Sequence, residues 1–172
     1  MMSPSRLRPP GQVLVRIGAT SVNLALKGGF AEYAVAAESA LAHKPAELTF
    51  AQASTIPQAG AIALQGTAGA AAGDRVLIHG AGARSGSFAV QLAKPLGAHV
   101  TGVDNAAKLK FIRALGTDDA IDYREEDFTQ SELTYDLILD LVASRSVFAY
   151  RRALAPTAVI AASEGPYERW SR

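Results

Sequence analysis

Cysteine is absent from the 172-residue sequence, and aromatic residues make up only 7% of it. The missing cysteines exclude disulfide bonds and every zinc site with thiolate ligands, whether structural or catalytic. The three histidines, His43, His79 and His99, do not have the spacing of metal ligands, so the sequence predicts no metal site. With 15 glycines beside so few aromatic residues, the composition indicates helices and strands that pack closely.

Long apolar runs and an excess of one charge are also missing. No run reaches the roughly 18 apolar residues of a membrane span. Residues 1–11 carry Arg6 and Arg8 with no apolar segment behind them, unlike a secretory signal. We therefore expect a cytoplasmic protein with no membrane partner. The 17 basic and 16 acidic residues give a net charge of +1, which predicts no nucleic-acid partner and favours a small-molecule substrate.

The N-terminal part of the sequence predicts short strands followed by a helix. Strands are expected at Val13–Ile17 and at Phe30–Val35, where apolar residues partly alternate with polar ones. Thr49 and Gln52 have the spacing of a capping box, in which the two side chains satisfy free N–H groups at a helix start. We expect a helix over about 50–67, interrupted by a proline.

From Asp74 onward, short aliphatic runs alternate with helical patterns. Such alternation with short loops predicts a parallel sheet covered by helices on both faces, because each crossover returns to the sheet with right-handed sense. The fold class is therefore α/β, with a Rossmann-like doubly wound parallel sheet. The strands are expected at 76–78, 100–103, 120–123, 136–142 and 159–161, and the helices between them at about 88–96, 109–115 and 145–154.

A glycine-rich loop joins the first of these strands to the helix that follows. Dinucleotide sites need glycine at this point for a tight turn, for room beside the pyrophosphate and for close helix packing. Asp104 ends the second strand, where a carboxylate can accept hydrogen bonds from the adenosine ribose. A loop without ligand and a solvated aspartate is the alternative, and we favour the nucleotide site. The loop consists of Gly80, Ala81, Gly82, Ala83, Arg84, Ser85 and Gly86.

Several blocks of this sequence together resemble one family. As an ordered set they are similar to zinc-independent medium-chain dehydrogenases/reductases of the quinone oxidoreductase (zeta-crystallin-like) group, shortened in the catalytic domain and at the C-terminus. The matching blocks are Gly11–Arg16, Ser21–Asn23, Gly28–Tyr33, His79–Ala81, Gly86–Lys94, Gly97–Val103, Ile121–Phe128, Tyr135–Asp140 and Arg151–Pro156.

The resemblance implies an oxidoreductase that binds NADP or NAD and transfers a hydride to a quinone, an enone or a carbonyl compound. In such enzymes the positions of Asp104, Lys108 and Tyr123 surround the 2′ position of the adenosine. Lys108 and Tyr123 suit a 2′-phosphate, whereas Asp104 would repel one, so the choice between NADP and NAD stays open. Lys108 can equally be a solvated helix residue, and Tyr123 a residue that covers the sheet.

Two departures from the family pattern lie in and after the loop. Ala83 and Arg84 stand where the family usually has glycine. Arg84 can either block the phosphate site or clamp a phosphate with charge-assisted hydrogen bonds. Pro95 forfeits a backbone hydrogen bond late in the next helix, so we expect that helix to kink or end early.

Most of the family's catalytic domain has no counterpart in this sequence. Only residues 24–27 separate Asn23 from Gly28, where the family has most of a small β-barrel domain. We interpret 1–48 as a remnant of a GroES-like catalytic domain and 49–172 as a Rossmann-type NAD(P)-binding domain that lacks its last strand. Asn23 matches a catalytic asparagine of the family, although a turn-capping role is favoured here.

These observations support two functions. The first is an NAD(P)-dependent oxidoreductase whose activity is weak or lost, and the alternative is a non-catalytic dinucleotide-binding or interaction module derived from such an enzyme. An exposed edge of the sheet also makes a homodimer through that edge a hypothesis.

Two smaller expectations concern His79 and the acidic run 125–127. His79 lies beside the loop, where contact with the cofactor is one interpretation, but a hydrogen bond from the ring to the backbone is favoured. The acidic run is expected to form the first turn of a helix.

Overall fold

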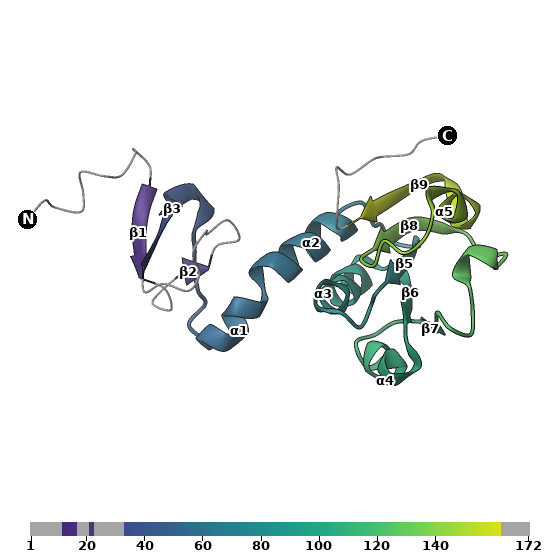
Figure 1. Cartoon of the computed structure of the whole chain (residues 1–172), viewed down its shortest axis with the longest axis horizontal. Helices are drawn as coiled ribbons and strands as arrows, with labels where there is room; N and C mark the ends of the chain where they lie inside the picture. The colour runs from purple at the N-terminus through teal and green to yellow at the C-terminus, as the bar shows by residue number, and fades with distance from the viewer. Residues whose placement is uncertain (1–11, 17–20, 23–32, 163–172) are drawn as a thin grey trace, which may run out of the picture. The chain divides into compact units, whose positions relative to one another are not determined.

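The chain divides into two compact units, with the boundary in the sequence between Gln58 and Ala59 (Figure 1). The structure is a computed structural model that describes residues 12–16, 21–22 and 33–162. The assignment of 1–48 and 49–172 to a catalytic remnant and a cofactor domain stays a prediction.

The first unit contains two small antiparallel sheets. Strand β1 (Gln12–Arg16) pairs with β3 (Tyr33–Ala37), and β2 (Ser21–Val22) pairs with β4 (Ala42–His43). The strands β1 and β3 overlap the two predicted strands at 13–16 and 33–35, and residues 17 and 30–32 of the predictions lie outside the described residues. A short 3-10 helix, η2 (Glu38–Ala40), follows β3.

The capping box starts helix α1 as predicted. The Thr49 hydroxyl accepts a hydrogen bond from the Gln52 N–H, and the Gln52 side chain accepts one from the Thr49 N–H. Helix α1 (Phe50–Thr55) ends before Pro57, which begins helix α2 (Pro57–Thr67). The predicted interruption is therefore confirmed, because proline fits the first position of a new helix.

The second unit is a five-stranded parallel sheet with the order β7-β6-β5-β8-β9 (Figure 1). The chain builds outward from β5 through β6 to β7, then returns to the other side of β5 for β8 and β9. The predicted Rossmann-like topology is thus confirmed, with its switch point between β5 and β8. The strands are β5 (Arg75–His79), β6 (His99–Asp104), β7 (Asp119–Asp122), β8 (Tyr135–Asp140) and β9 (Leu154–Ala162).

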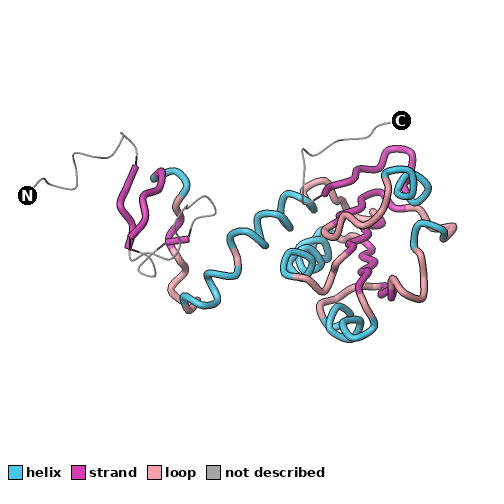
Figure 2. The backbone as a smooth tube through the Cα atoms, viewed as in Figure 1, coloured by secondary structure: helices cyan, strands magenta, loops and turns pink. Residues whose placement is uncertain are grey.

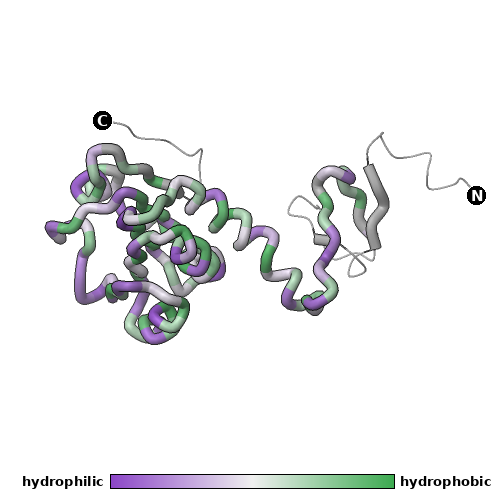
Figure 3. The backbone as a smooth tube through the Cα atoms, turned by 180° about the vertical axis from the view of Figure 1, so that it is seen from behind, coloured by the Kyte–Doolittle hydropathy of each residue, from purple (hydrophilic) through white to green (hydrophobic). Residues whose placement is uncertain are grey.

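Helices cover both faces of this sheet, as a doubly wound fold requires (Figure 2). One face packs against α2, α3 (Arg84–Ala93) and α4 (Ala106–Ala114), which contribute Ala63, Val90 and Ile112 to a buried cluster. The opposite face packs against a 3-10 helix, η4 (Phe128–Gln130), and α5 (Val147–Ala153), and the hydropathy of these segments can be followed in Figure 3.

Two predicted helix ends are confirmed in this unit. Helix α3 stops at Ala93, and Pro95 lies in the 3-10 turn η3 (Lys94–Leu96) that replaces its continuation. Gly116 has φ 108° just beyond α4, a conformation that glycine adopts at no steric cost. The acidic run was expected to open a helix, but only Asp127 does so, as the cap of η4, while the N–H groups of Glu125 and Glu126 bond to Asp122.

Candidate functional site

The glycine-rich loop turns sharply from β5 into α3. Gly80 has φ 86°, and the N–H groups of Gly80 and Ala81 donate to the Val103 carbonyl at 2.9 and 3.2 Å. Helix α3 then starts at Arg84, and its N-cap residue Ala83 offers no side-chain acceptor. The first N–H groups of α3 therefore lack a capping side chain, which leaves the positive end of the helix dipole for an anion.

Gly86 allows the start of α3 to lie directly against the loop. A Cβ atom at this position would lie 2.1 Å from the Gly80 carbonyl oxygen and 2.7 Å from the Ala81 Cα. Both are backbone atoms, so neither can move without displacing the loop. This contact is the physical reason for glycine here, in agreement with the close helix packing that dinucleotide loops require.

Asp104 is buried and tied to the loop. Its Oδ2 accepts a hydrogen bond from the Gly82 N–H at 2.9 Å, and its Oδ1 accepts from the backbone N–H of Asn105 at 2.8 Å. The Lys108 ammonium lies 3.4 Å from Oδ1. The aspartate is thus 6% exposed, unlike the solvated residue expected of a loop without ligand. The charges of Asp104 and Lys108, which oppose each other toward a 2′-phosphate, form an ion pair.

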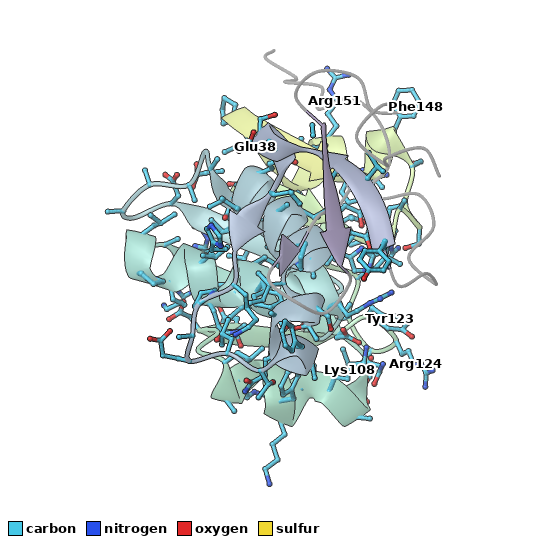
Figure 4. The ribbon with its side chains drawn as sticks, turned by 90° about the vertical axis from the view of Figure 1, so that its left-hand side faces the viewer. Glu38, Lys108, Tyr123, Arg124, Phe148 and Arg151 are labelled. Carbon is cyan, nitrogen blue, oxygen red and sulfur yellow. The ribbon has the colours of Figure 1, made fainter. Side chains whose placement is uncertain are left out.

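Tyr123 lies beside this ion pair, on the turn after β7. The residue is 39% exposed, and the Arg124 guanidinium lies 5.7 Å from the centre of its ring. Figure 4 shows Lys108, Tyr123 and Arg124 on the same side of the unit. Lys108 and Tyr123 both line one cavity, so the structure brings together the residues predicted around an adenosine.

The cavity has a volume of about 380 Å³ and opens at the carboxyl ends of β5, β6 and β8. Five predicted site residues line it, namely Gly80, Ala83, Asp104, Lys108 and Tyr123. Ala81 is buried in the core, Gly82 and Gly86 shape the loop, and Ser85 and the exposed Arg84 belong to the first turn of α3. Asn23 lies outside the described residues.

Sequence reasoning missed half of the cavity lining. Three of the missed residues end a strand or lie directly next to such an end, and the other two, Val142 and Ser144, lie in the loop that follows β8. Because parallel strands present their carboxyl ends at one edge, the strand ends themselves are the signal that could have found them. They are His79, Val103, Asn105, Val142 and Ser144.

His79 does not bond to the backbone through its ring, so that expectation is wrong. Its Nδ1 lies 3.1 Å from Asp140 Oδ1, across the neighbouring ends of β5 and β8. The Tyr150 hydroxyl donates to Asp140 Oδ2, and the N–H groups of Val142 and Ala143 donate to Oδ1, each at 3.0 Å. These groups form a buried hydrogen-bond network, called here the Asp140 network.

The Asp140 network keeps its central carboxylate ionised. Burial alone would raise the pKa of Asp140, but the hydrogen bonds from His79, Tyr150, Val142 and Ala143 outweigh burial and lower the pKa to about 2. Burial and the hydrogen bond to the carboxylate raise the pKa of Tyr150. The tyrosine therefore remains a donor to Asp140 under ordinary conditions.

The network also holds Ala143 in a left-handed conformation, with φ 53°. This conformation costs an alanine about 1 to 2 kcal/mol. We expect Ala143→Gly to raise the free energy of unfolding by about 0.5 to 1 kcal/mol, because part of the gain is offset by the flexibility of glycine in the unfolded chain. Urea unfolding measures this change. The control Ala107→Gly, at an exposed position of α4, should lower the free energy of unfolding by about 1 kcal/mol. A lower free energy of unfolding for Ala143→Gly would contradict the strain at Ala143.

Comparisons with known proteins agree with this geometry. Residues 86–163 match the zinc-binding dehydrogenase family. The chain is 35% identical over 119 residues to a 2-methylene-furan-3-one reductase of Solanum lycopersicum, covering 67% of this chain and 31% of that protein. It is 36% identical over 126 residues to the Homo sapiens mitochondrial NAD(P)H oxidoreductase RTN4IP1, covering 67% of this chain and 32% of that one.

A solved structure shows the same likeness. The quinone oxidoreductase from Coxiella burnetii superposes with a TM-score of 0.70 at 35% identity, over 75% of this chain and 42% of that one. Together the matches confirm the resemblance to medium-chain dehydrogenases/reductases that the motifs indicate. The chain spans about a third of the length of these curated relatives.

The family name implies zinc, but the residues present do not fit that ion. The sequence has no cysteine. Across residues 12–16, 21–22 and 33–162, no three side chains of histidine, aspartate or glutamate are grouped so that they could hold a metal. No step of the proposed chemistry therefore passes through zinc.

Proposed function

We propose that the cavity binds NADH or NADPH and that the chain is an oxidoreductase that works without zinc and reduces a quinone, an enone or a carbonyl compound. One observation carries the proposal: the uncapped start of α3 follows a loop held by Asp104, at the mouth of a cavity on the switch-point edge of the sheet. The bound nicotinamide would supply the hydride, and the protein would supply binding and orientation.

The residues of the loop fit such a ligand. Ala83 lines the cavity with a single methyl group, and Arg84 is exposed and is not among the side chains that line the described cavity. The side chain that could have blocked the site therefore leaves the cavity clear. We propose that the N–H groups of Arg84, Ser85 and Gly86 hold the pyrophosphate, while Asp104, Lys108 and Tyr123 hold the adenosine ribose.

Titration of the purified chain with NADH and with NADPH, followed by nicotinamide fluorescence, tests this function. Saturable binding is expected for at least one of them. If neither binds at millimolar concentration, both cofactor interpretations are wrong. Turnover of a quinone acceptor by the bound form would support the enzyme, and binding without turnover would support the module that binds dinucleotide and performs no catalysis.

Asn23 is the proposed catalytic residue, by its match to the family, in a remnant of a GroES-like domain. The function assigns it a hydrogen bond to the substrate carbonyl. Asn23→Ala should then lower turnover without changing cofactor affinity, whereas unchanged turnover would leave Asn23 its turn-capping role.

The ion pair between Asp104 and Lys108 is proposed to set the choice between NADH and NADPH. Asp104→Ser should release Lys108 toward a 2′-phosphate and remove a repelling charge, raising the affinity ratio of NADPH to NADH by about tenfold or more. Lys108→Ala should lower that ratio, and Lys110→Ala, on the same helix but away from the cavity, is the control. The two cofactor titrations measure the ratio; an unchanged ratio in Asp104→Ser would refute the placement.

Two further proposals concern the assembly and the location of the protein. Strand β9 ends the described sheet, with β8 as its partner, and we propose that two chains pair through this edge. A clean monomer in size-exclusion chromatography at high concentration would contradict this dimer.

Cytoplasmic location stays a proposal, since the human relative is named as mitochondrial. Within the described residues, no helix has the length and apolar character needed to cross a bilayer.

A further inference from the structure

His79 occupies the switch point of the sheet, next to the loop that is proposed to hold phosphate. In the parallel register of β5 and β8, His79 lies opposite Asp140, the last residue of β8. Ligands of open α/β sheets bind outside the carboxyl ends of the strands at such a point. His79 lines the cavity although the residue is only 4% exposed.

Asp140 fixes which nitrogen of the ring can meet a ligand. The Asp140 carboxylate accepts hydrogen bonds from His79 Nδ1, from the Tyr150 hydroxyl and from two backbone N–H groups. All four donors belong to the protein, so the carboxylate holds them in place. The carboxylate partner places a proton on Nδ1. In the Nδ1–H tautomer of an imidazole, Nε2 is a hydrogen-bond acceptor. Phe128 packs edge-on against the ring, with 5.6 Å between centroids, and restricts its rotation.

The lining of the cavity separates two ends of a ligand. Asp104, Lys108 and Tyr123, from β6, α4 and the turn after β7, line the end proposed for the adenosine. His79 and Val142 line the end between β5 and β8, which only the half of a dinucleotide beyond the pyrophosphate would reach. In that half of the ligand, the second ribose carries hydroxyl groups, which can donate a hydrogen bond to a neutral imidazole.

We propose that His79 Nε2 accepts a hydrogen bond from a hydroxyl of the second ribose, and that Asp140 and Tyr150 are positioning residues that hold the imidazole for this contact. The inference rests on the proposed dinucleotide function and deepens it. It assigns recognition to the half of the ligand that the glycine-rich loop and Asp104 do not read. An imidazole nitrogen that is nearly buried gains a partner when the ligand binds, which favours the bound state.

Binding of fragments to the full chain tests this assignment. Calorimetric titrations would use an adenosine probe (5′-AMP, or 2′,5′-ADP if NADPH is the cofactor), the ADP-ribose with the same 2′ group, and the matching nicotinamide dinucleotide. His79→Phe should weaken the two larger ligands by about tenfold and leave the adenosine probe unchanged. His79→Gln, which keeps an acceptor, should restore part of the affinity. Tyr150→Phe should produce a smaller loss on the same two ligands.

The outcomes separate this inference from the function on which it rests. If the wild-type chain binds none of the probes, the proposed function itself fails. If the wild type binds and His79→Phe binds all probes equally well, the assignment of His79 is wrong. Equal weakening of all three probes by His79→Phe would also overturn it, because a distorted loop would then account for the loss. Circular dichroism of each variant reports whether the fold persists.

Discussion

Gly86→Ala should destabilise the second unit by about 3 kcal/mol or more, the upper end of what an added methyl group costs in a tightly packed site. The new Cβ would lie 2.1 Å from the Gly80 carbonyl oxygen, and backbone surrounds it on the loop side. Relief would require α3 to move away from the loop, which also separates the helix N-terminus from the cavity. Folded protein that remains should therefore bind dinucleotide much more weakly.

Urea unfolding followed by circular dichroism measures the change. Gly69→Ala is the matched control, because a Cβ at Gly69 would have no atom within 4 Å. The control should unfold at nearly the wild-type midpoint. Equal midpoints for the two variants would show that the loop and α3 separate at little cost, and that Gly86 has no packing role.

Asp140→Asn should lower the free energy of unfolding at pH 7 by about 3 kcal/mol. The carboxylate accepts four hydrogen bonds in a buried position, and bonds to a charged acceptor contribute about 1.5 to 3 kcal/mol each. The amide that replaces it has a single acceptor oxygen and brings two donors toward groups that also donate. The pair of strand ends at β5 and β8 then loses its central acceptor.

The same carboxylate predicts a dependence of stability on pH. The folded pKa of Asp140, about 2, lies below its ordinary value of 3.8. A lowered pKa stabilises the fold above the ordinary value, and this contribution is lost as the pH falls from about 4 to about 2. The expected loss is about 2 kcal/mol, and it should be missing in Asp140→Asn. Urea unfolding of both proteins between pH 2 and 6 measures it.

A second aspartate with a lowered pKa serves as the control for this pH series. Burial would raise the pKa of Asp118, but the hydrogen bonds from Lys94 and Val100 lower it. Because its ion pair with Lys94 is about one-third exposed on both sides, solvent screens the interaction. Asp118→Asn should therefore keep most of the wild-type pH dependence. If Asp140→Asn keeps it as well, Asp140 is not the group responsible.

The periodic part of the fold could be predicted from the sequence, whereas the point at which β8 ends could not. The strands β5 to β9 were each expected, because short aliphatic runs alternate with helical patterns. The expected fourth strand extended to Val142, but β8 ends at Asp140, whose side chain accepts the N–H groups of Val142 and Ala143. A local bond between side chain and backbone competes there with the sheet.

The parts of the site that depend on residues close together in the sequence could be predicted, and the contacts between distant residues could not. The loop 80–86 and Asp104 follow from spacing along the chain. The contact between His79 and Asp140 joins residues 61 positions apart and requires the register of β5 on β8. No motif encodes that register, so His79 was expected to meet backbone instead. The site roles themselves stay predictions until binding is measured.

The hydrogen bond from the Gly82 N–H to Asp104 has a consequence for the entropy of binding. The loop is already held by the protein's own carboxylate, so its backbone freedom is lost during folding rather than during association. A preorganised loop spares the ligand that ordering cost, and the affinity then depends on the contacts themselves. Asp104 thus has two roles. In the proposed site it is a partner for the ribose, and in the absence of a dinucleotide its hydrogen bond from Gly82 holds the loop in its conformation.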